Sequence, residues 1–472
     1  MFEQVDLDEA AGRKWDVIVA GTSFAAMFFS KALPAGLDVL FIEKGAIQPH
    51  QDQLARGTRY IEEIDQENTS GHKKGWVAHT LFGGNSNCWW GQTPRLHPND
   101  FRLRSLYGIG EDWPLSYDDL EPHYLEAEQV MEIAGGGNEH VLPRSAPFPY
   151  PPHALTLAET EFARARPDIW FPAPAARANG GSRNTCCANG VCDLCPIDAK
   201  FTILNGLSAF ERPGARLLTK AEVRSVRIEG NRARGVAVRT GFGRTTELRA
   251  EVIALATNAL FNAAILLRSD LGNAALGRYI NEQTAREFFV DIPIENYYGG
   301  TSVTAHCYGL YDGVHRRDNG AVLVESYNSP PKLRPEPGKW THRLHLKCIA
   351  EDLPLAENRV ILTGAGEPRI LWTGHSEYGR KGLDFALRNL ATILPVEIEA
   401  LYHYRQGETE AHIQGTHRMG TDPATSVVDT RLRSHAAPNL FVLGAGAFPS
   451  CSPANPTLTL AALSLLAGGT LK

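Results

Sequence analysis

The residues best suited to metal or redox chemistry form a cysteine cluster in the middle of the chain. Four of the eight cysteines, Cys186, Cys187, Cys192 and Cys195, lie within ten residues, in a segment that contains Gly190. Short turns of this kind can bring several thiolates to one point, and thiolates favour iron–sulfur clusters or zinc over hard cations. A proline directly after the last cysteine also recurs in iron–sulfur loops. We therefore expect a cluster or metal site, with zinc and free or paired thiols as alternatives, rather than a disulfide framework.

A second candidate site lies near the N-terminus, where a short apolar strand runs into a tight turn and a helix. Gly21 takes the first position of a dinucleotide fingerprint, while Ser23 and Ala26 stand where two more glycines are usual. Small residues there let the backbone approach a pyrophosphate at the helix N-terminus. Glu43 follows about 20 residues later, where a carboxylate can accept hydrogen bonds from ribose hydroxyls and disfavours a 2′-phosphate. The segment predicts a cradle for an adenosine diphosphate group, with an ordinary βαβ turn as the alternative.

The composition is that of an ordinary globular protein. The 472 residues carry a formal net charge of −6, which gives no electrostatic reason to expect nucleic acid or an anionic membrane as a partner. The longest apolar stretch, 458–466, is far shorter than the roughly 20 residues that span a bilayer. The N-terminus lacks the pattern of a secretory signal. We expect two domains, no membrane span, and a cytoplasmic location, or a periplasmic one if a signal-bearing partner subunit carries the protein out.

Hydrophobic patterning predicts the elements that must position these residues. Strands are expected at 16–20, 38–43, 252–256 and 439–444, with a β-meander over 215–239. Helices are expected at 27–33, 117–134, 259–268, 381–394 and 458–466. The chain from 288 to 372 is strand-rich, as in an antiparallel substrate-binding sheet. Between 71 and 174 the sequence is rich in glycine and proline, and only 117–134 has a clear helical pattern.

Several further segments resemble the glucose–methanol–choline (GMC) oxidoreductases. They are the glycine-rich loop 83–90, the segment 412–423 with 426–429, the strand 439–442, the closing loop 455–459, and the weaker 357–362. The resemblance implies an α/β (α+β) two-domain fold, with a Rossmann-like FAD-binding domain and an antiparallel-sheet substrate-binding domain. The implied FAD-binding domain is discontinuous and comprises 1–100, 186–285 and 405–472. The substrate-binding domain with its connecting loops comprises 101–185 and 286–404.

The resemblance also implies the catalytic residues. Relatives place a histidine before a Gly-Thr pair and a histidine or asparagine in the final loop, which here are His412 and Asn455. His412 would take the hydroxyl proton as hydride leaves carbon for the flavin, since the ordinary pKa of histidine is near neutral. Asn455 would hold the substrate oxygen, or alternatively cap the closing helix. His417 is interpreted as a structural or FAD-proximal residue.

The implied cofactor is non-covalent FAD. Cys88 stands where some sugar-oxidising relatives carry a histidine bonded to the flavin; a cysteinyl link is the alternative to a small residue packed beside the ring. The residues expected to contact FAD are Gly21, Thr22, Ser23, Ala26, Glu43, Gly83, Gly84, Asn85, Ser86, Asn87, Cys88, Val223, Thr257, Gly446, Pro456 and Thr457.

The cysteine segment resembles that of the catalytic subunits of bacterial fructose and glucose dehydrogenases, where a similar loop holds a three-iron, four-sulfur (3Fe–4S) cluster near FAD. This chain departs from that pattern, because two residues rather than three separate Cys192 from Cys195. With such a cluster, the resemblance implies a small partner subunit and a cytochrome-type electron acceptor.

Together these segments look most like bacterial glucoside 3-dehydrogenases. The expected function is oxidation of a ring hydroxyl of a sugar or glycoside to the ketone. The aromatic side chains of Trp89, Trp90, Tyr297 and Tyr298 could stack on a pyranose, or pack in the core. The alternatives are an oxidase of another alcohol or a C-glycoside that uses oxygen or a quinone, and a non-catalytic FAD-binding assembly subunit. An NAD-linked dehydrogenase is disfavoured by the lack of a second glycine-rich nucleotide loop.

Overall fold

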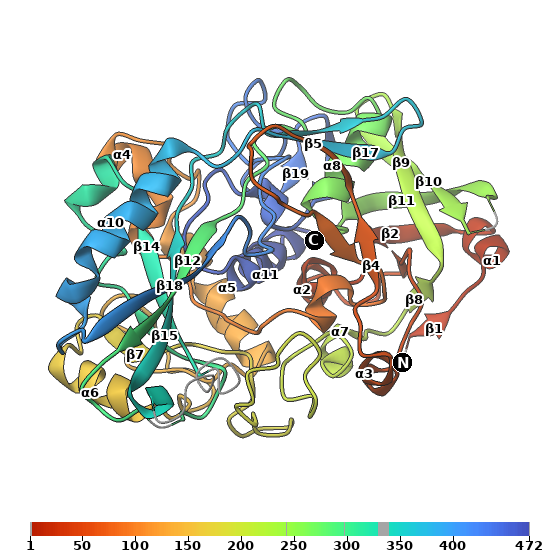
Figure 1. The fold of residues 1–472 in the computed structure, drawn as a ribbon. Helices are drawn as coiled ribbons and strands as arrows, with labels where there is room; N and C mark the ends of the chain where they lie inside the picture. The colour runs from red at the N-terminus through yellow and green to blue at the C-terminus, as the bar shows by residue number, and fades with distance from the viewer. Residues whose placement is uncertain (1, 242, 297, 329–338, 472) are drawn as a thin grey trace.

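The computed structural model describes residues 2–241, 243–296, 298–328 and 339–471, which build two large sheets side by side (Figure 1). The first sheet has the strand order β1 (Glu3–Gln4), β8 (Ala215–Leu218), β3 (Val39–Ile42), β2 (Lys14–Ala20), β11 (Thr245–Leu255), β10 (Arg232–Thr240) and β9 (Ala221–Glu229). In addition, β20 (Ala437–Val442) pairs with β11, and β19 (Arg433–Ser434) pairs with β20. The pairs from β1 to β11 are parallel, whereas β11, β10 and β9 are antiparallel. The meander predicted over 215–239 is thus found in β9 and β10, but β8 pairs in parallel with β3 and β1, and β11 continues the meander beyond the predicted range.

The first sheet is built around the predicted βαβ unit. Helix α2 (Phe24–Lys31) connects β2 to β3 and packs against the closing helix α11 (Thr457–Gly468), which in turn contacts α5 (Tyr117–Val130). Strand β2 has β3 on one side and β11 on the other, so the chain leaves β2 at a topological switch point. Ligands bind α/β sheets in the crevice at the carboxyl ends of strands at such points. The predicted nucleotide loop therefore lies where the fold provides a binding crevice.

The second sheet is antiparallel throughout and has two chemically different faces. Its order is β18 (Ala400–Gly407), β12 (Thr284–Asp291), β15 (Arg343–Ala350), β14 (Val322–Tyr327), β13 (Val303–Cys307) and β7 (Trp170–Pro172). Alternate side chains such as Phe288, Val324 and Leu346 form one core with α6 (Leu157–Ala165) and α10 (Glu377–Ile393). The residues between them on the strands include Glu287, Glu325 and Lys347, which point to the opposite face. These two sheets confirm the predicted fold class.

The remaining elements connect the two sheets or cover their edges. A three-stranded sheet contains β16 (Arg359–Leu362), β17 (Pro368–Trp372) and β5 (Asp65–Asn68), and β4 (Ile61–Glu63) pairs with β6 (Val77–His79). The other α-helices are α1 (Leu7–Ala11), α3 (His50–Arg56), α4 (Leu103–Tyr107), α7 (Leu207–Phe210) and α8 (Ala259–Arg268). The 3₁₀ helices are η1 (Gly84–Asn87), η2 (Pro98–Phe101), η3 (Val314–Arg317), η4 (Lys339–His342) and η5 (Ala445–Ala447).

The sequence located the long, strongly patterned elements and missed some short ones. Helix α8 has the predicted bounds, and α10 and α11 begin within four residues of the predicted start. The prediction that 117–134 is the one clear helix between 71 and 174 was wrong, because α6 also lies there. Its start carries a capping box, in which Thr156 and Glu159 bond reciprocally to each other's backbone N–H groups.

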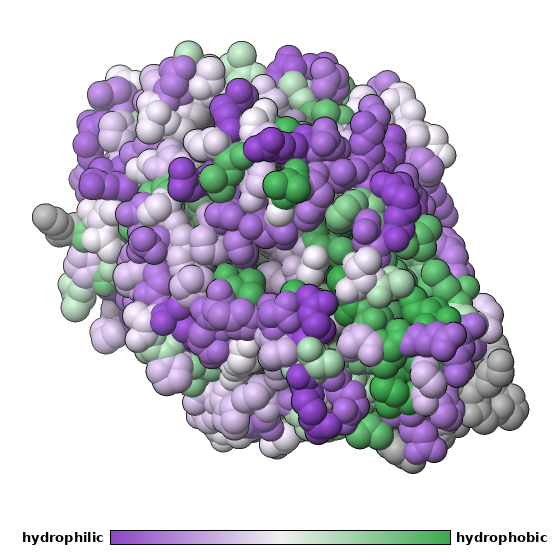
Figure 2. Space-filling view, turned by 90° about the vertical axis from the view of Figure 1, so that its left-hand side faces the viewer, coloured by the Kyte–Doolittle hydropathy of each residue, from purple (hydrophilic) through white to green (hydrophobic). Residues whose placement is uncertain are grey.

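The surface is mixed in character. Figure 2 shows a face on which hydrophilic residues dominate and hydrophobic ones gather in one area. Large hydrophobic side chains that are exposed include Leu401, Tyr402 and Tyr404 on the edge strand β18. Within the described part of the chain, no helix combines the length and the apolar character that a bilayer crossing requires.

Candidate active site

The predicted nucleotide-binding loop begins at Gly21, directly after β2. Gly21 has a φ of +97°, and a Cβ placed on it would lie 2.5 Å from the carbonyl oxygen of Ala256. Only glycine fits this position, because the conformation is left-handed and the backbone after β11 comes too close for a side chain. The same approach brings Thr257 beside Gly21, where its backbone was predicted to lie close to the nucleotide. Ser23 begins α2 without making a side-chain cap, and Ala26 is fully buried within it.

Thr22 links Glu43, the predicted ribose-binding residue, to the glycine-rich loop 83–90. Its hydroxyl donates to Glu43 Oε2 at 2.5 Å and accepts from the backbone N–H of Gly83 at 2.9 Å. Glu43 is buried, and burial raises its pKa although the bonds from Thr22 and from the Gly45 N–H act to lower it. A carboxylate held at the end of β3 in this way fits the recognition of ribose hydroxyls. Thr22 thus compensates in part for the missing glycines of the fingerprint.

The glycine-rich loop is shaped by its own side chains. Asn85 Oδ1 accepts from the backbone N–H of His79 at 2.9 Å, Ser86 Oγ accepts from the N–H of Ile203 at 3.2 Å, and Asn87 Nδ2 donates to Phe82 O at 2.9 Å. Gly83 and Gly84 have φ values of +89° and +53°, so both turns are left-handed. The polar side chains of the loop thus bond to its own surroundings, and its contact with FAD stays a prediction.

Cys88 closes this loop and is half-buried. Burial raises the pKa of its thiol, which reduces the thiolate needed for a covalent flavin link. This environment favours the interpretation of Cys88 as a small packed residue.

Lys200 joins the glycine-rich loop to the cysteine segment, and it was not among the predicted site residues. Its ammonium is fully buried and donates to four backbone carbonyls, those of Asn87 at 3.1 Å, Trp89 at 2.6 Å, Cys192 at 2.7 Å and Asp193 at 3.2 Å. Burial lowers the pKa of Lys200. One cation therefore holds two loops of irregular backbone together.

The predicted base and the predicted substrate-binding amide are connected by Gln283. His412 Nδ1 lies 3.1 Å from Gln283 Oε1, and Gln283 Nε2 donates to Ser452 O at 2.8 Å and to Ala454 O at 3.1 Å. The two carbonyls fix the orientation of the Gln283 amide, because a carbonyl only accepts. Its oxygen therefore faces His412 and, being an acceptor, requires a proton on Nδ1. This leaves His412 Nε2 with a free lone pair, as a base needs.

The electrostatics keep His412 neutral. The side chain is half-buried, and burial lowers its pKa to about 4, with Glu325 acting to raise the pKa and Lys347 to lower it. His417 is fully buried, and burial lowers its pKa to about 3. Its Nδ1 lies 3.0 Å from Thr416 Oγ1, and its ring packs so tightly on Gly446 that a Cβ there would lie 1.9 Å from Cε1. This arrangement agrees with a structural role for His417.

Asn455 follows directly on the loop that Gln283 holds. Its side chain is buried, and Oδ1 has no hydrogen-bond partner among the described residues. Helix α11 has Pro456 at its N-cap position and Thr457 as its first residue, and no side chain caps it. The alternative that Asn455 caps this helix is therefore wrong, and its amide oxygen is buried without a partner.

The remaining residues predicted to contact FAD or a sugar are Val223 and four aromatic residues. Val223 is buried in β9. Trp89 donates to Phe201 O and packs on Phe24, which supports the interpretation that this ring packs in the core. Trp90 is half-buried, and its ring lies 6.0 Å from the ring of Tyr327. Tyr298 is partly exposed, and Tyr297 lies outside the described residues.

The four clustered cysteines do not converge. Cys186 Sγ lies 3.5 Å from Thr301 Oγ1, Cys192 Sγ donates to Ser302 Oγ at 3.2 Å, and Cys195 Sγ accepts from the Ala199 N–H at 3.3 Å. Cys187 is exposed. Among the described residues, no group of three or more His, Cys, Asp or Glu side chains is arranged to hold a metal. The expected convergence of the four thiolates was therefore wrong. Cys186 and Cys192 face the consecutive residues Thr301 and Ser302, but no third thiol joins them, so these residues do not fit a 3Fe–4S cluster.

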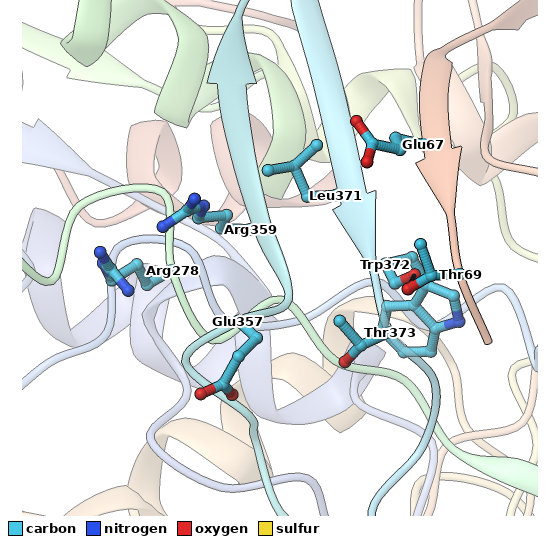
Figure 3. Close-up of a pocket in the computed structure, with 8 residues that line it drawn as sticks. All are labelled: Glu67, Thr69, Arg278, Glu357, Arg359, Leu371, Trp372 and Thr373. Atoms are coloured by element: carbon cyan, nitrogen blue, oxygen red, sulfur yellow. Dashed lines mark hydrogen bonds between the residues drawn. The ribbon is translucent and has the colours of Figure 1, made fainter.

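An open pocket of about 250 Å³ lies elsewhere, on the three-stranded sheet (Figure 3). Its lining residues are Glu67, Thr69, Arg278, Glu357, Arg359, Leu371, Trp372 and Thr373. None of them is a predicted catalytic or FAD-binding residue. We assign the active site to the surroundings of His412 instead.

Comparison with known proteins decides the family. Residues 156–285 match the N-terminal profile of the GMC oxidoreductases, and residues 379–464 match the C-terminal profile. The chain belongs to the GMC oxidoreductase family. The C-terminal match contains His412 and Asn455, and the N-terminal match contains Lys200 and Gln283. This GMC oxidoreductase is a flavin enzyme that acts on CH–OH groups, with FAD as its cofactor.

Named relatives agree with this assignment. The protein is 28% identical over 433 aligned residues to the fructose dehydrogenase large subunit of Gluconobacter japonicus, covering 82% of this chain and 79% of the relative. It is also 28% identical over 505 aligned positions to the paromamine 6′-oxidase of Streptomyces fradiae, covering 96% and 90%. The crystal structure of pyridoxine 4-oxidase from Mesorbium loti superposes with a TM-score of 0.69 at 19% identity, covering 96% and 98%, which shows a shared fold.

Proposed function

We propose that this protein oxidises a ring hydroxyl of a sugar or glycoside to a ketone. The observation that carries the proposal is the hydrogen-bonded chain from His412 through Gln283 to the loop before Asn455. It supports the proposal because it links a neutral histidine to the loop that ends at Asn455. Two relatives named for fructose and for paromamine support a carbohydrate substrate.

The residues have distinct roles in this reaction. His412 Nε2 accepts the hydroxyl proton as the carbon–hydrogen bond breaks, and the oxygen keeps the electron pair that becomes the carbonyl π bond. Asn455 would hold the substrate oxygen near that nitrogen by donating from its amide Nδ2. Bound FAD supplies the acceptor for the hydride, so two electrons and one proton leave the carbon and one proton goes to His412. Gly21, Thr22, Glu43 and the loop 83–88 would hold the cofactor.

We assign no electron-transfer step to the cysteine segment, because its four thiols do not converge. The proposed acceptor of the electrons is oxygen, a quinone or a partner protein. The relative named as a large subunit supports a partner protein, and a complex of that kind would contain a smaller second subunit. Iron and acid-labile sulfide counts on the anaerobically purified protein test the cluster directly, since about three irons per flavin would restore the predicted electron path.

The experiment that tests the function is anaerobic reduction of the flavin. Glucose, fructose and methyl β-glucoside are added in turn, without NAD, to the purified FAD-bound protein and to a His412→Ala variant. Bleaching of the flavin bands by a sugar in the wild type, and a large loss of that rate in the variant, is expected. Bleaching only by simple non-sugar alcohols would favour an oxidase of another alcohol. Retention of FAD with no bleaching by any alcohol would favour the non-catalytic assembly subunit.

A further inference from the structure

A row of charged side chains crosses the second sheet on the face opposite the helices. The strand register pairs His306 with Glu325, Glu325 with Lys347, Lys347 with Glu287, and Glu287 with Arg405, across the five strands β13, β14, β15, β12 and β18. We call these five residues the charged row. Charged groups are seldom this deeply buried without a specific purpose, and here the four on β12 to β15 are all buried.

The charged row faces the active site. The charges of Glu325 and Lys347 both act on the pKa of His412, in opposite directions, so all three side chains lie close together. Lys347 also forms an ion pair with Glu410, which precedes His412 by two residues. At the end of β14, the ring of Tyr327 lies 6.0 Å from the ring of Trp90, the last residue of the glycine-rich loop 83–90. The row thus has one neighbour in the segment of the predicted base and another in the glycine-rich loop.

One half of the charged row is internally satisfied. Glu287 Oε2 lies 2.9 Å from His345 Nε2, and its Oε1 accepts from Arg405. Lys347 is bonded to Glu410 and lies between the carboxylates of Glu287 and Glu325. These groups neutralise one another, so this half of the row needs no ligand.

The other half has unpartnered polar atoms. Glu325 Oε2 accepts from the Tyr327 hydroxyl at 2.8 Å. Among the described residues, Glu325 Oε1 accepts no hydrogen bond, and its contact with His306 Nε2 is a loose ion pair at 3.8 Å. Both ring nitrogens of His306 and the hydroxyl of Tyr308 are also buried without a hydrogen bond. Glu325 is 2% exposed and His306 is fully buried. Leaving such groups unpaired is costly, so they are set up for a ligand that supplies the missing partners.

The charge state of Glu325 selects the kind of partner. Burial raises its pKa, but His306 and Lys347 outweigh this and lower the pKa to about 2, so the group is a carboxylate. A carboxylate oxygen with no partner needs a donor, and His306 and Tyr308 can each donate or accept. Neighbouring hydroxyls of a sugar ring offer donors and acceptors together. A cationic ligand is disfavoured because Lys347 stands next to Glu325 in the row.

We infer that Glu325, supported by His306 and Tyr308, binds the ring hydroxyls next to the one that is oxidised, and thereby selects polyhydroxylated rings over simple alcohols. The inference rests on the proposed function and adds the residues that determine its specificity. Hydrogen bonds to a charged acceptor are the strong ones, and their loss costs about ten- to hundredfold in binding or rate.

The test compares deoxy sugars with the parent sugar in matched variants. Wild type, Glu325→Gln and the control Glu287→Gln are each given a methyl glucoside and its single deoxy analogues, and the rate of anaerobic flavin bleaching is measured against concentration. In the wild type, removing the contacted hydroxyl is expected to lower kcat/KM about ten- to hundredfold. In Glu325→Gln the ratio of kcat/KM between the parent sugar and that deoxy analogue is expected to fall to a few-fold. Glu287→Gln is expected to keep the wild-type ratio, because both carboxylate oxygens of Glu287 already have partners within the protein.

The outcomes separate the two proposals. If the wild type oxidises sugars but every deoxy analogue loses the same factor in Glu325→Gln as in wild type, the inference fails and the proposed function stands. If no sugar bleaches the wild-type flavin, both fail. If the wild type prefers an aminosugar to the neutral parent sugar and Glu325→Gln loses that preference, Glu325 binds an ammonium group, and the inference that it binds a ring hydroxyl is overturned. If Glu325→Gln does not retain FAD, His306→Gln is measured in its place, with the same loss of discrimination expected.

Discussion

Gln283 fixes which nitrogen of His412 carries the proton. The Gln283 amide is anchored by two backbone carbonyls through Nε2, so its Oε1 lies 3.1 Å from His412 Nδ1 and accepts from it. The same two carbonyls belong to the loop that ends at Asn455. One buried side chain therefore sets the tautomer of the base and its position relative to the amide that would hold the substrate.

Replacement of Gln283 by leucine tests this positioning role. We expect a roughly 10- to 100-fold fall in kcat/KM, because His412 loses the bond that fixes its orientation and tautomer. The acid limb of the pH profile should also move to lower pH, since the lost acceptor stabilised the protonated ring more than the neutral one. The control is Gln414→Leu, another buried glutamine, whose amide contacts Cys451 Sγ at 3.6 Å and not His412. An unchanged pH profile in Gln283→Leu would contradict the role.

The pKa of His412 predicts an unusual pH dependence. Because burial lowers the pKa to about 4, the neutral base is present above that pH and is lost as the pH falls through it. At pH 5 about 90% of the ring would be neutral, against about 3% for a histidine at its ordinary pKa of about 6.5. We expect kcat/KM with a sugar to be nearly the same at pH 5 and pH 7. An acid limb centred near pH 6.5 would show that burial does not control this group.

Asn455→Ala separates substrate binding from helix capping. The amide oxygen has no partner among the described residues and α11 has no side-chain cap. We therefore expect a roughly 10- to 100-fold lower kcat/KM, with unchanged FAD content and an unchanged melting temperature. Loss of a cap would instead cost about 1 kcal/mol of folding stability with little effect on the reaction. Thermal unfolding and sugar-dependent flavin reduction, measured on the same preparation, distinguish the two.

How much of this site could be predicted depended on where the signal lies in the chain. Gly21 and Glu43 could be proposed from the sequence because their spacing within one βαβ unit is local. His412 and Asn455 could be proposed because their segments resemble those of a known family. Gln283 was missed because it lies 129 residues before His412, and nothing in either segment indicates the contact.

For the cysteine segment, the sequence predicted a site that the structure does not contain. Spacing alone predicted that four thiols converge, but spacing does not determine where each side chain points. Cys186 and Cys192 turn toward the hydroxyls of Thr301 and Ser302, which come from a distant part of the chain just before β13. The charged row was missed for a related reason, because it exists only once the strand register places Glu325 between His306 and Lys347.

Lys200→Met tests whether the glycine-rich loop depends on one buried cation. The four carbonyls that Lys200 binds belong to two loops, and methionine fills a similar volume without any donor. Each buried carbonyl left without a partner costs about 1–3 kcal/mol, so we expect a clearly lower melting temperature together with weaker retention of FAD on gel filtration. Lys381→Met is the control, because that lysine is exposed and water screens its pair with Glu377. A destabilised Lys200→Met protein that still binds FAD as tightly as the wild type would show that the loop is shaped without this lysine.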